Sequence, residues 1–341
     1  MNTNTQNYVA GSSGKAKSVT ITGTGSYVPE RVLTNADLEK MVDTTDEWIV
    51  SRSGIRERHI ARPDEATSDM AAEASRRALA QAGVAAEDVD LIIVATVTPD
   101  MMLPNTACFV QNLIGARNAT CFDLEAACSG FLYAMNVASQ FIRTGAVKTA
   151  LVIGAEKLST VTDWEDRATC VLFGDGAGAV VLQACDAPRG FLATVTGSDG
   201  ALADLLKIPG GGSRNPTSTE TVQKRMHCMQ MVGKEVFKNA VRSMGDAARN
   251  ALEQSGLTLD DVACVVPHQA NIRIVNAIRE RLGVAPEKFY VNLDRFGNMS
   301  AASIPVALDE AVRNGRIKAG DVVVMVAFGG GFTWGASVIR M

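Results

Sequence analysis

Histidine and paired cysteines are scarce in this sequence of 341 residues. Histidine occurs three times, at positions 59, 227 and 268, and the seven cysteines never form a C-x-x-C pair. Zinc sites usually combine Cys and His ligands at short spacings, so we predict no metal site. No apolar run reaches the ~20 residues of a membrane-spanning helix, so we also predict no membrane insertion.

An excess of positive charge is missing as well. The chain carries 33 Lys and Arg against 37 Asp and Glu, a formal net charge of −4. Nucleic-acid-binding surfaces are usually strongly basic, so we expect no nucleic-acid partner. Residues 1–17 lack the apolar core of a secretory signal, and we predict a disordered lead-in there. Scattered cysteines without an export signal are typical of reduced thiols, which indicates a cytoplasmic protein.

The sequence contains an internal repeat. The pattern A-L-x-Q-x-G at residues 78–83 recurs at 251–256, an offset of 173 from residue 78 to residue 251. Each copy predicts a helix that ends at a glycine, then a short acidic turn, then an apolar strand, at 91–96 and at 262–266. One short match can arise by chance, so a second match is required before a repeat is inferred.

A second pair of segments provides that match. Residues 142–148, IRTGAVK, resemble residues 312–318, VRNGRIK, at an offset of 170 from residue 142 to residue 312. Each copy is followed by an apolar strand, at 149–154 and at 322–328, and then by a glycine-rich turn. Two matches in the same order, at nearly the same offset, indicate a duplicated fold.

The predicted strands are apolar throughout and alternate with helices, which is typical of a buried, mainly parallel sheet covered by helices. We therefore predict an α/β fold of two pseudo-symmetric halves, residues 18–185 and residues 190–341. The segment 208–220 is rich in Gly, Ser, Thr and Pro and predicts a loop, either near a binding site or simply exposed.

Three chemically useful side chains follow predicted strands. The offset of 170 maps Cys128 onto Asn298, and each lies between a predicted strand, 121–124 or 289–293, and a helix. His268 directly follows another predicted strand. Ligands of doubly wound sheets bind beyond the carboxyl ends of the strands. We therefore expect a thiol, an imidazole and a carboxamide to meet at one site.

Cys128 is the candidate nucleophile because it precedes a predicted buried helix. The free N–H groups of a helix N-terminus favour the thiolate, so we expect a lowered pKa. Taken singly, each of the three residues also fits a structural role: Cys128 as a small packing residue, His268 as a core histidine, and Asn298 as a turn residue. Their combination favours a catalytic site.

Several longer motifs carry a family resemblance. From Val19 to Met341 the chain resembles the β-ketoacyl-[acyl-carrier-protein] synthases III, condensing enzymes that initiate bacterial type II fatty-acid synthesis, within the thiolase-like superfamily. That resemblance implies a thiolase-like fold, layered as an α-β-α-β-α sandwich, and a homodimer. The motifs that carry it are GTGSYVPE (23–30), TNADLEKMVDTTDEWIVSRSGIRERHIA (34–61), AACSGF (126–131), FGDGAGA (173–179), VPHQANIRI (266–274), LDRFGNMSAASIP (293–305) and FGGGFTWG (328–335).

The resemblance also implies a mechanism. Cys128 would take an acyl group from an acyl-CoA primer, while the backbone N–H groups of Cys128 and Gly330 hold the oxyanion. His268 and Asn298 would then stabilise the enolate formed when malonyl-acyl carrier protein loses CO₂. The products would be β-ketoacyl-acyl carrier protein, CoA and CO₂. No cofactor is expected.

Substrate contacts are implied in the same way. CoA would be bound by Thr44, Trp48, Arg52, Arg167 and Asn271, with the adenine stacked between Trp48 and Arg167. The acyl carrier protein would contact Gln269, Ala270, Asn271, Ile272, Arg273 and Lys238. Lys238 belongs to a basic stripe with Lys234 and Arg242, at a spacing that usually marks a solvated helix face but also fits an acidic partner.

The chain departs from the family pattern at Leu103, which we assign to the acyl pocket. Many members have an aromatic residue there that reaches across the dimer, so a leucine predicts acceptance of longer or branched primers. Two alternatives stay open. One is a specialised relative that acts in secondary metabolism or joins two acyl chains. The other is a non-catalytic scaffold that binds acyl-CoA.

Overall fold

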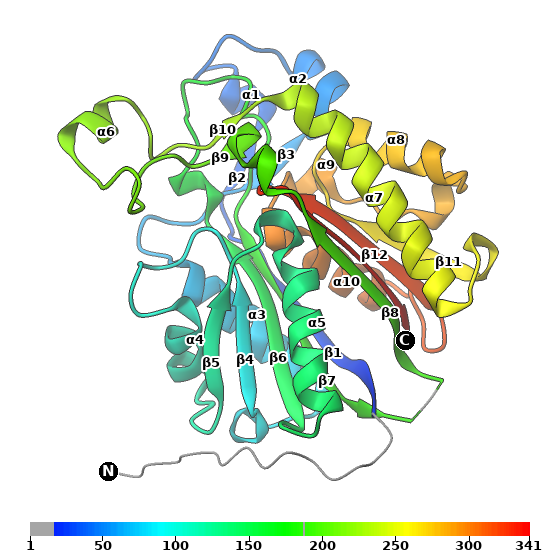
Figure 1. Cartoon of the computed structure of the whole chain (residues 1–341). Helices are drawn as coiled ribbons and strands as arrows, with labels where there is room; N and C mark the ends of the chain where they lie inside the picture. The colour runs from blue at the N-terminus through cyan, green and yellow to red at the C-terminus, as the bar shows by residue number, and fades with distance from the viewer. Residues whose placement is uncertain (1–16, 187) are drawn as a thin grey trace.

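Two β-sheets, separated by a layer of helices and covered by further helices, form the frame of the chain (Figure 1). The computed structural model describes residues 17–186 and 188–341. The predicted lead-in at 1–17 thus lies outside the described residues, apart from Lys17. In the described part of the chain, no helix is long and apolar enough to cross a lipid bilayer.

The two sheets differ in strand number. In spatial order, the first consists of β1 (Ser18–Tyr27), β7 (Gly176–Cys185), β6 (Thr149–Glu156), β4 (Leu91–Ala95) and β5 (Thr120–Leu124). The second consists of β11 (Val262–Pro267), β12 (Val322–Gly329), β13 (Thr333–Arg340) and β8 (Gly190–Ser198). Two small ladders pair β2 (Val32–Thr34) with β3 (Glu57–His59), and β9 (Leu206–Lys207) with β10 (Gln230–Met231).

The helices form three layers around these sheets. Between the sheets lie α5 (Gly130–Arg143) and α10 (Ser303–Arg313); α3 (Thr67–Ala82) and α4 (Thr106–Ile114) cover the first sheet; α7 (Gly233–Ser255) and α8 (Ile272–Leu282) cover the second. The shorter helices are α1 (Asn35–Leu38), α2 (Asp46–Ser53), α6 (Thr219–Gln223) and α9 (Leu293–Phe296). Single 3₁₀ turns are η1 (Ala86–Asp88), η2 (Ala127–Ser129), η3 (Leu158–Thr160), η4 (Gly200–Leu205), η5 (Leu259–Asp261), η6 (Pro286–Lys288) and η7 (Ser300–Ala302). The predicted α-β-α-β-α layering is confirmed.

Helices on both faces of each sheet explain why the central strands are apolar at every position. In β4, Leu91 and Ile93 point into the middle layer, whereas Ile92 and Val94 pack under α3 and α4. Successive side chains of a strand point to opposite faces, so both sets must be apolar when both faces are covered. The middle layer is one hydrophobic cluster with residues from both predicted halves, and the boundary at 185–190 stays a prediction.

The prediction of mainly parallel sheets is wrong. β4 runs parallel to β5 and β6, and β11 runs parallel to β12, but the other four pairings in the two sheets are antiparallel. Continuous apolar character reports that helices cover both faces, and it carries no information on strand direction. β12 returns directly into β13 through the short turn at residues 330–332.

The repeat is confirmed, with one correction to its offset. In both copies a long helix ends at a left-handed glycine, Gly83 or Gly256, and a 3₁₀ turn then enters a buried strand. The turn η7 follows η2 at an offset of 173, but α10 is three residues shorter than α5. The residue equivalent to Cys128 is therefore Ala301, and Asn298 lies three residues before it.

The strand predicted at 289–293 is also wrong. Only a single bridge joins Phe289 to Val265 there, and α9 begins at Leu293. Asn292 is buried, donates its N–H to Gln269 Oε1 at 3.1 Å, and donates its side-chain amide to Glu310 at 2.8 Å. Hydrogen bonds that involve side chains thus satisfy the polar groups of this segment, whereas a β-strand would have paired its backbone with a neighbouring strand.

The close contact of η7 with β6 predicts a sensitive glycine. A Cβ added at Gly154 would lie 2.2 Å from the Ala301 carbonyl oxygen, so Gly154→Ala must displace η7. We expect a loss of about 1–3 kcal/mol in the free energy of unfolding, because overpacking forces the backbone apart. Thermal unfolding measures it. The matched control is Gly200→Ala, whose Cβ would meet nothing within 4 Å. Equal melting temperatures for the two variants would contradict the packing argument.

Candidate active site

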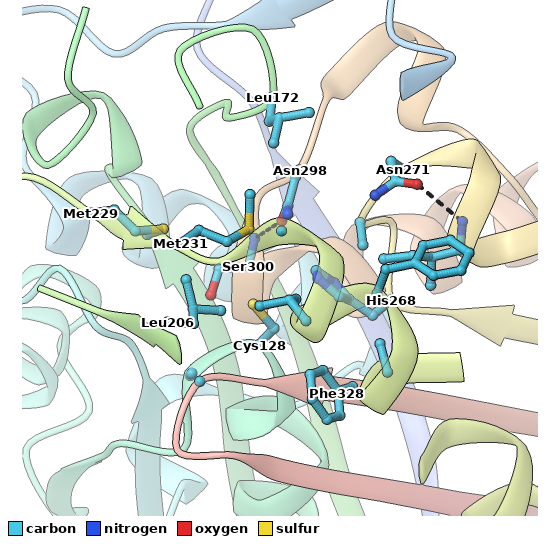
Figure 2. A pocket seen from close by; sticks show the side chains of 18 of the residues that line it. Cys128, Leu172, Leu206, Met229, Met231, His268, Asn271, Asn298, Ser300 and Phe328 are labelled. Carbon is cyan, nitrogen blue, oxygen red and sulfur yellow. Dashed lines mark hydrogen bonds between the residues drawn. The ribbon is translucent and has the colours of Figure 1, made fainter. Parts of the chain in front are cut away.

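A cavity of about 810 Å³ is lined by residues from both predicted halves. Cys128, His268 and Asn298 all line it and lie around one space (Figure 2), and Gly330 lines it as well. Cys128 comes from η2 in the first half, whereas the other three residues come from the second half. The structure thus brings together the three side chains that the repeat and the strand ends predict.

Cys128 lies in a tight turn just before α5. Ala127, which precedes it, has φ +46°, and the end of β12 lies directly against the turn. A Cβ at Gly329 would lie 2.6 Å from the Cys128 nitrogen. Glycine is therefore required at this point of the FGGG motif, since only a bare backbone lets β12 approach the nucleophile.

The predicted lowering of the Cys128 pKa is wrong. Burial raises the pKa of the thiol to about 12, and the hydrogen bond from the Ser300 hydroxyl opposes this only in part. The carboxylates of Glu156 and Glu125 raise the pKa further. A helix N-terminus contributes about half a unit charge, and here desolvation outweighs it. Cys128 is therefore a thiol at neutral pH and must lose its proton as it reacts.

His268 follows β11 and is buried beside Ser303. Its Nδ1 lies 2.6 Å from Ser303 Oγ, which also receives the Gln269 N–H at 3.4 Å. The Ser303 hydroxyl also lies 2.9 Å from the Ser300 carbonyl oxygen, to which it can donate its one proton instead of to Nδ1. The tautomer of neutral His268 therefore depends on which of these two acceptors the Ser303 hydroxyl serves. Burial lowers the pKa of His268 to about 4, so the ring is neutral and offers an N–H donor.

Asn298 is clamped between the two halves. Its backbone forms a bridge with Phe173, donating N–H to the Leu172 carbonyl at 2.8 Å and accepting from Gly174 N at 3.1 Å. Its Oδ1 accepts the Ser300 N–H at 2.9 Å, which leaves the side-chain NH₂ group as a donor. The FGDGAGA motif of the first half therefore positions the carboxamide of the second.

The rest of the cavity is largely apolar. Its wall is formed by α7, β9, β10 and their connections, which bring several long aliphatic and thioether side chains together (Figure 2). Such a wall suits an extended, mostly apolar chain. Of the predicted loop 208–220, Ile208 reaches the cavity. Apolar lining residues include Leu206, Ile208, Met229, Met231, Val236, Phe237, Ala240, Met244, Ile274 and Phe328.

The predicted nucleotide contacts cluster at one end of this cavity. Arg52 and Asn271 line it, and the Arg52 guanidinium lies 6.0 Å from the Trp48 ring centre. Arg167 lies 5.4 Å from the same ring and donates to the Asp43 carbonyl oxygen at 2.7 Å. An aromatic ring with two guanidinium groups is suited to a base and its phosphates. Thr44 lies four residues before Trp48, and its Oγ1 is buried without a hydrogen-bond partner.

The predicted carrier-protein contacts need one correction. Gln269 is fully buried, where it donates to the Pro267 and Tyr290 carbonyls, so it cannot contact a protein partner. It supports the loop after β11. Ala270, Asn271 and Ile272 are half-buried, whereas Arg273 is exposed and its guanidinium lies over Phe237. Arg273 forms a basic rim together with exposed lysine and arginine side chains on α7, namely Lys234, Lys238 and Arg242.

Leu103, the predicted acyl-pocket residue, does not line the cavity. It is 85% exposed, next to Met102 at 84% and Met101 at 48%. Three adjacent exposed apolar side chains are unusual on a soluble surface and mark an interaction site. A role for Leu103 in an acyl pocket therefore requires a second chain.

Ser300, Ser303 and Glu156 are site residues that sequence reasoning missed. The two serines stand inside the motif around Asn298, where hydroxyls usually signal only a helix start. Glu156 ends an apolar strand, and that isolated charge was the available signal. Across residues 17–186 and 188–341 no group of three His, Cys, Asp or Glu side chains is placed to hold a metal ion.

Comparisons with known proteins agree with this geometry. Residues 122–200 match the family described as 3-oxoacyl-[acyl-carrier-protein (ACP)] synthase III, and residues 252–341 match its C-terminal region. A β-ketoacyl-[acyl-carrier-protein] synthase III from Desulfitobacterium hafniense is 60% identical over 323 residues, covering 95% of this chain and 98% of that protein. "3-Oxoacyl" and "β-ketoacyl" denote the same group.

Solved structures show the same fold. The 3-oxoacyl-[acyl-carrier-protein] synthase III from Aquifex aeolicus VF5 is 49% identical with a TM-score of 0.88, covering 95% of this chain and all of that one. The priming β-ketosynthase from the R1128 polyketide biosynthetic pathway is 37% identical with a TM-score of 0.87, covering 96% of this chain and 97% of that one. The architecture is thus shared by enzymes of more than one pathway.

The buried histidine predicts a specific pH response. Its pKa falls from 6.5 to about 4 on folding, so the unfolded state binds more protons between these values and stability falls as the pH falls through that window. We expect the His268 ring signal in NMR to stay neutral down to about pH 5. With three histidines in the chain, His268→Gln identifies the signal and should weaken the acid dependence of the melting temperature. A His268 signal that titrates near pH 6.5 would contradict the assignment.

Proposed function

Because the chain belongs to the 3-oxoacyl-[acyl-carrier-protein] synthase III family, we propose that its condensation reaction uses Cys128 as the nucleophile and His268 and Asn298 as hydrogen-bond donors to the enolate. The chain is a β-ketoacyl-acyl carrier protein synthase III, a condensing acyltransferase that initiates fatty-acid synthesis. The observation that carries the assignment of roles is the meeting of these three side chains in one apolar cavity.

The first half-reaction acylates Cys128. Its sulfur attacks the thioester carbon of an acyl-CoA, the bond to the CoA sulfur breaks, and the acyl group stays on the enzyme. The N–H groups of Cys128 and Gly330 bind the oxyanion, which the glycines at 329 and 330 support by letting the two backbones approach. Cys128 and Gly330 both line the cavity.

The second half-reaction uses the other two side chains. Malonyl-acyl carrier protein enters, its C–CO₂ bond breaks, and the electron pair forms an enolate whose carbon attacks the acyl-Cys128 carbonyl. The bond between that carbon and the Cys128 sulfur then breaks, which releases β-ketoacyl-acyl carrier protein and returns Cys128, after it takes up a proton, to its thiol form. In this proposal the Ser303 hydroxyl donates to His268 Nδ1, so that His268 Nε2–H and the Asn298 NH₂ group donate hydrogen bonds to the enolate oxygen. Neutral His268 is well suited, because a donor that holds its proton stabilises the negative oxygen without protonating it.

The two substrates enter by different contacts. We assign CoA to Thr44, Trp48, Arg52, Arg167 and Asn271, and the pantetheine chain to the apolar wall. The acyl carrier protein is acidic by family resemblance and suits the rim of Arg273 and Lys238, with Ala270, Asn271 and Ile272 at its base. In this proposal both reactions use side chains and substrates, with no cofactor, in the cytoplasm.

A homodimer would complete the acyl pocket. β5 is an edge strand with one paired neighbour, β4, and Met101, Met102 and Leu103 lie exposed on the loop that leads to α4. A second copy on this edge would cover those side chains and remove the open strand edge. Leu103 of each chain would then reach the partner's cavity.

Two alternatives lead to different observations. A specialised role would resemble that of the priming β-ketosynthase of polyketide biosynthesis, which is 37% identical to this chain, and it would change the primer rather than the chemistry. A non-catalytic scaffold would bind acyl-CoA without forming a covalent bond. The presence of all three reactive side chains at the cavity favours catalysis over the scaffold.

Intact-protein mass spectrometry tests the assignment of roles. We expect acetyl-CoA to add one acetyl group to the wild-type chain and none to Cys128→Ala. His268→Ala and Asn298→Ala should still acquire the acetyl group, but each should lose ~10²–10³-fold in condensation with malonyl-acyl carrier protein, because each removes an enolate donor. Binding of acetyl-CoA without any adduct on the wild-type chain would instead establish the scaffold alternative.

Leu103 predicts a broad primer range. We expect medium-length or branched acyl-CoA primers to be condensed at a measurable fraction of the acetyl-CoA rate, and Leu103→Phe to depress kcat/KM for the longer primers most, since a larger side chain shortens the pocket. A panel of primers with one malonyl-acyl carrier protein measures this. Strict use of acetyl-CoA by the wild-type enzyme would contradict it.

A further inference from the structure

A fully buried carboxylate lies behind the nucleophile, and the two half-reactions above do not use it. Glu156 is the last residue of β6. Its Oε2 accepts hydrogen bonds from Thr98 Oγ1 at 2.7 Å, Val97 N at 3.1 Å and Thr96 Oγ1 at 3.2 Å, and its Oε1 accepts a longer one from Val97 N at 3.3 Å. All these donors are neutral. Burial therefore raises the pKa of Glu156 to about 7.

The Ser300 hydroxyl is close enough to this carboxylate and to the Cys128 thiol to lower the pKa of both groups. Its turn, η7, packs against β6, which ends at Glu156, and against η2, which carries Cys128, and Ser300 lines the same cavity as Cys128. The Ser300 backbone is fixed, because its N–H donates to Asn298 Oδ1 at 2.9 Å and its φ is +45°. A left-handed conformation is strained for any residue with a side chain, and such strain is common at functional sites. Gly154 lets η7 rest on β6, which brings Ser300 to Glu156.

The other polar groups around Cys128 are poor acceptors for its proton. Burial lowers the pKa of His268 to about 4, so its ring is a weak base, and the Asn298 amide has no basic atom. Glu125 is a second carboxylate that faces Cys128, but it is exposed to solvent and its Oε1 accepts the Ala127 N–H at 3.0 Å. Glu156 is buried, linked to the sulfur through one hydroxyl, and has no cation among its hydrogen-bond donors.

We propose that Glu156 receives the Cys128 proton during acylation, through the Ser300 hydroxyl. As the sulfur–acyl bond forms, the thiol proton passes to Ser300 Oγ and the Ser300 proton passes to Glu156. As the bond to the CoA sulfur breaks, the CoA thiolate takes a proton back from Ser300, and Ser300 is reprotonated by Glu156. One thiol and one thioester thus give one thioester and one thiol, with no net proton gain or loss.

The ionisation of Glu156 suits this shuttle. A carboxyl group that titrates near pH 7 is ionised in a large fraction of molecules at neutral pH, and its conjugate acid is strong enough to return the proton. The titratable groups that face Cys128 are Glu156, Glu125 and His268, and the last stays neutral above about pH 5. The rate of acylation should therefore follow the ionisation of Glu156 near neutral pH.

The experiment is single-turnover acylation of the full chain by acetyl-CoA, followed as CoA release from about pH 5.5 to pH 9. This inference rests on the proposed acylation, so the wild-type acetyl adduct is confirmed first by mass. We expect the wild-type rate to rise with a midpoint near pH 7. Glu156→Gln keeps the shape of the side chain, but its acylation rate should no longer rise near pH 7. Above pH 7 this variant should react ~10²-fold more slowly than the wild-type chain.

Two further variants make the result decisive. Ser300→Ala keeps the carboxylate and removes the link, so it should show the same loss, and the double variant should be no slower than either single one. Glu125→Gln should keep the neutral-pH step. Removing a negative charge near a thiol lowers the thiol pKa, so a purely electrostatic role of Glu156 predicts faster acylation by Glu156→Gln. Faster acylation by Glu156→Gln would overturn the proposal. Additive losses in the double variant would also overturn it, and so would loss of the rate increase near pH 7 in Glu125→Gln instead of in Glu156→Gln.

Discussion

Close contact between two short turns and the strands of opposite halves is the constraint on which the site depends. The turn η2, which carries Cys128, rests on β12 at Gly329, and η7, which carries Ser300, rests on β6 at Gly154. In both places a Cβ would overlap backbone atoms. Because each turn is held by the other half, the nucleophile, the donors and the cavity wall are fixed relative to one another without a ligand. Such preorganisation is what a condensing site requires, since its donors must already face the oxygen where charge develops.

Desolvation decides the protonation states inside this frame. It keeps Cys128 a thiol, keeps His268 neutral, and brings Glu156 close to half-ionisation at pH 7. These effects act in different directions on acids and bases, because burial always disfavours the charged form. The consequence is that the two side-chain donors beside Cys128, His268 and Asn298, carry no positive charge. Neutral donors of this kind suit loss of CO₂, because a charged substrate group becomes neutral as it leaves.

The sequence was sufficient for the layered fold, the repeat and the meeting of three side chains, since periodic apolar residues and glycine-ended helices report burial directly. Strand direction and local offsets were less accessible. Continuous apolar strands look alike in parallel and antiparallel sheets, and a helix shortened by three residues shifted the apparent partner of Cys128 from Ala301 to Asn298. The Cys128 pKa was mispredicted because the helix N-terminus is visible in a sequence whereas the depth of burial is not. Gln269 was assigned to the carrier-protein contacts through the family resemblance, which carries no information on the burial of a single side chain in this chain.

The duplicated halves have similar backbones, but the residues at the ends of their equivalent strands beside Cys128 differ in chemistry. β6 and β12 occupy equivalent places, and their last residues are Glu156 and Gly329. One strand end supplies a side chain that can hold a proton, and the other supplies bare backbone that a neighbouring turn can touch. Divergence at a single pair of matching positions thus converts a two-fold symmetric scaffold into a directional one, with an ionisable wall on one side of the reacting sulfur and an unobstructed peptide on the other.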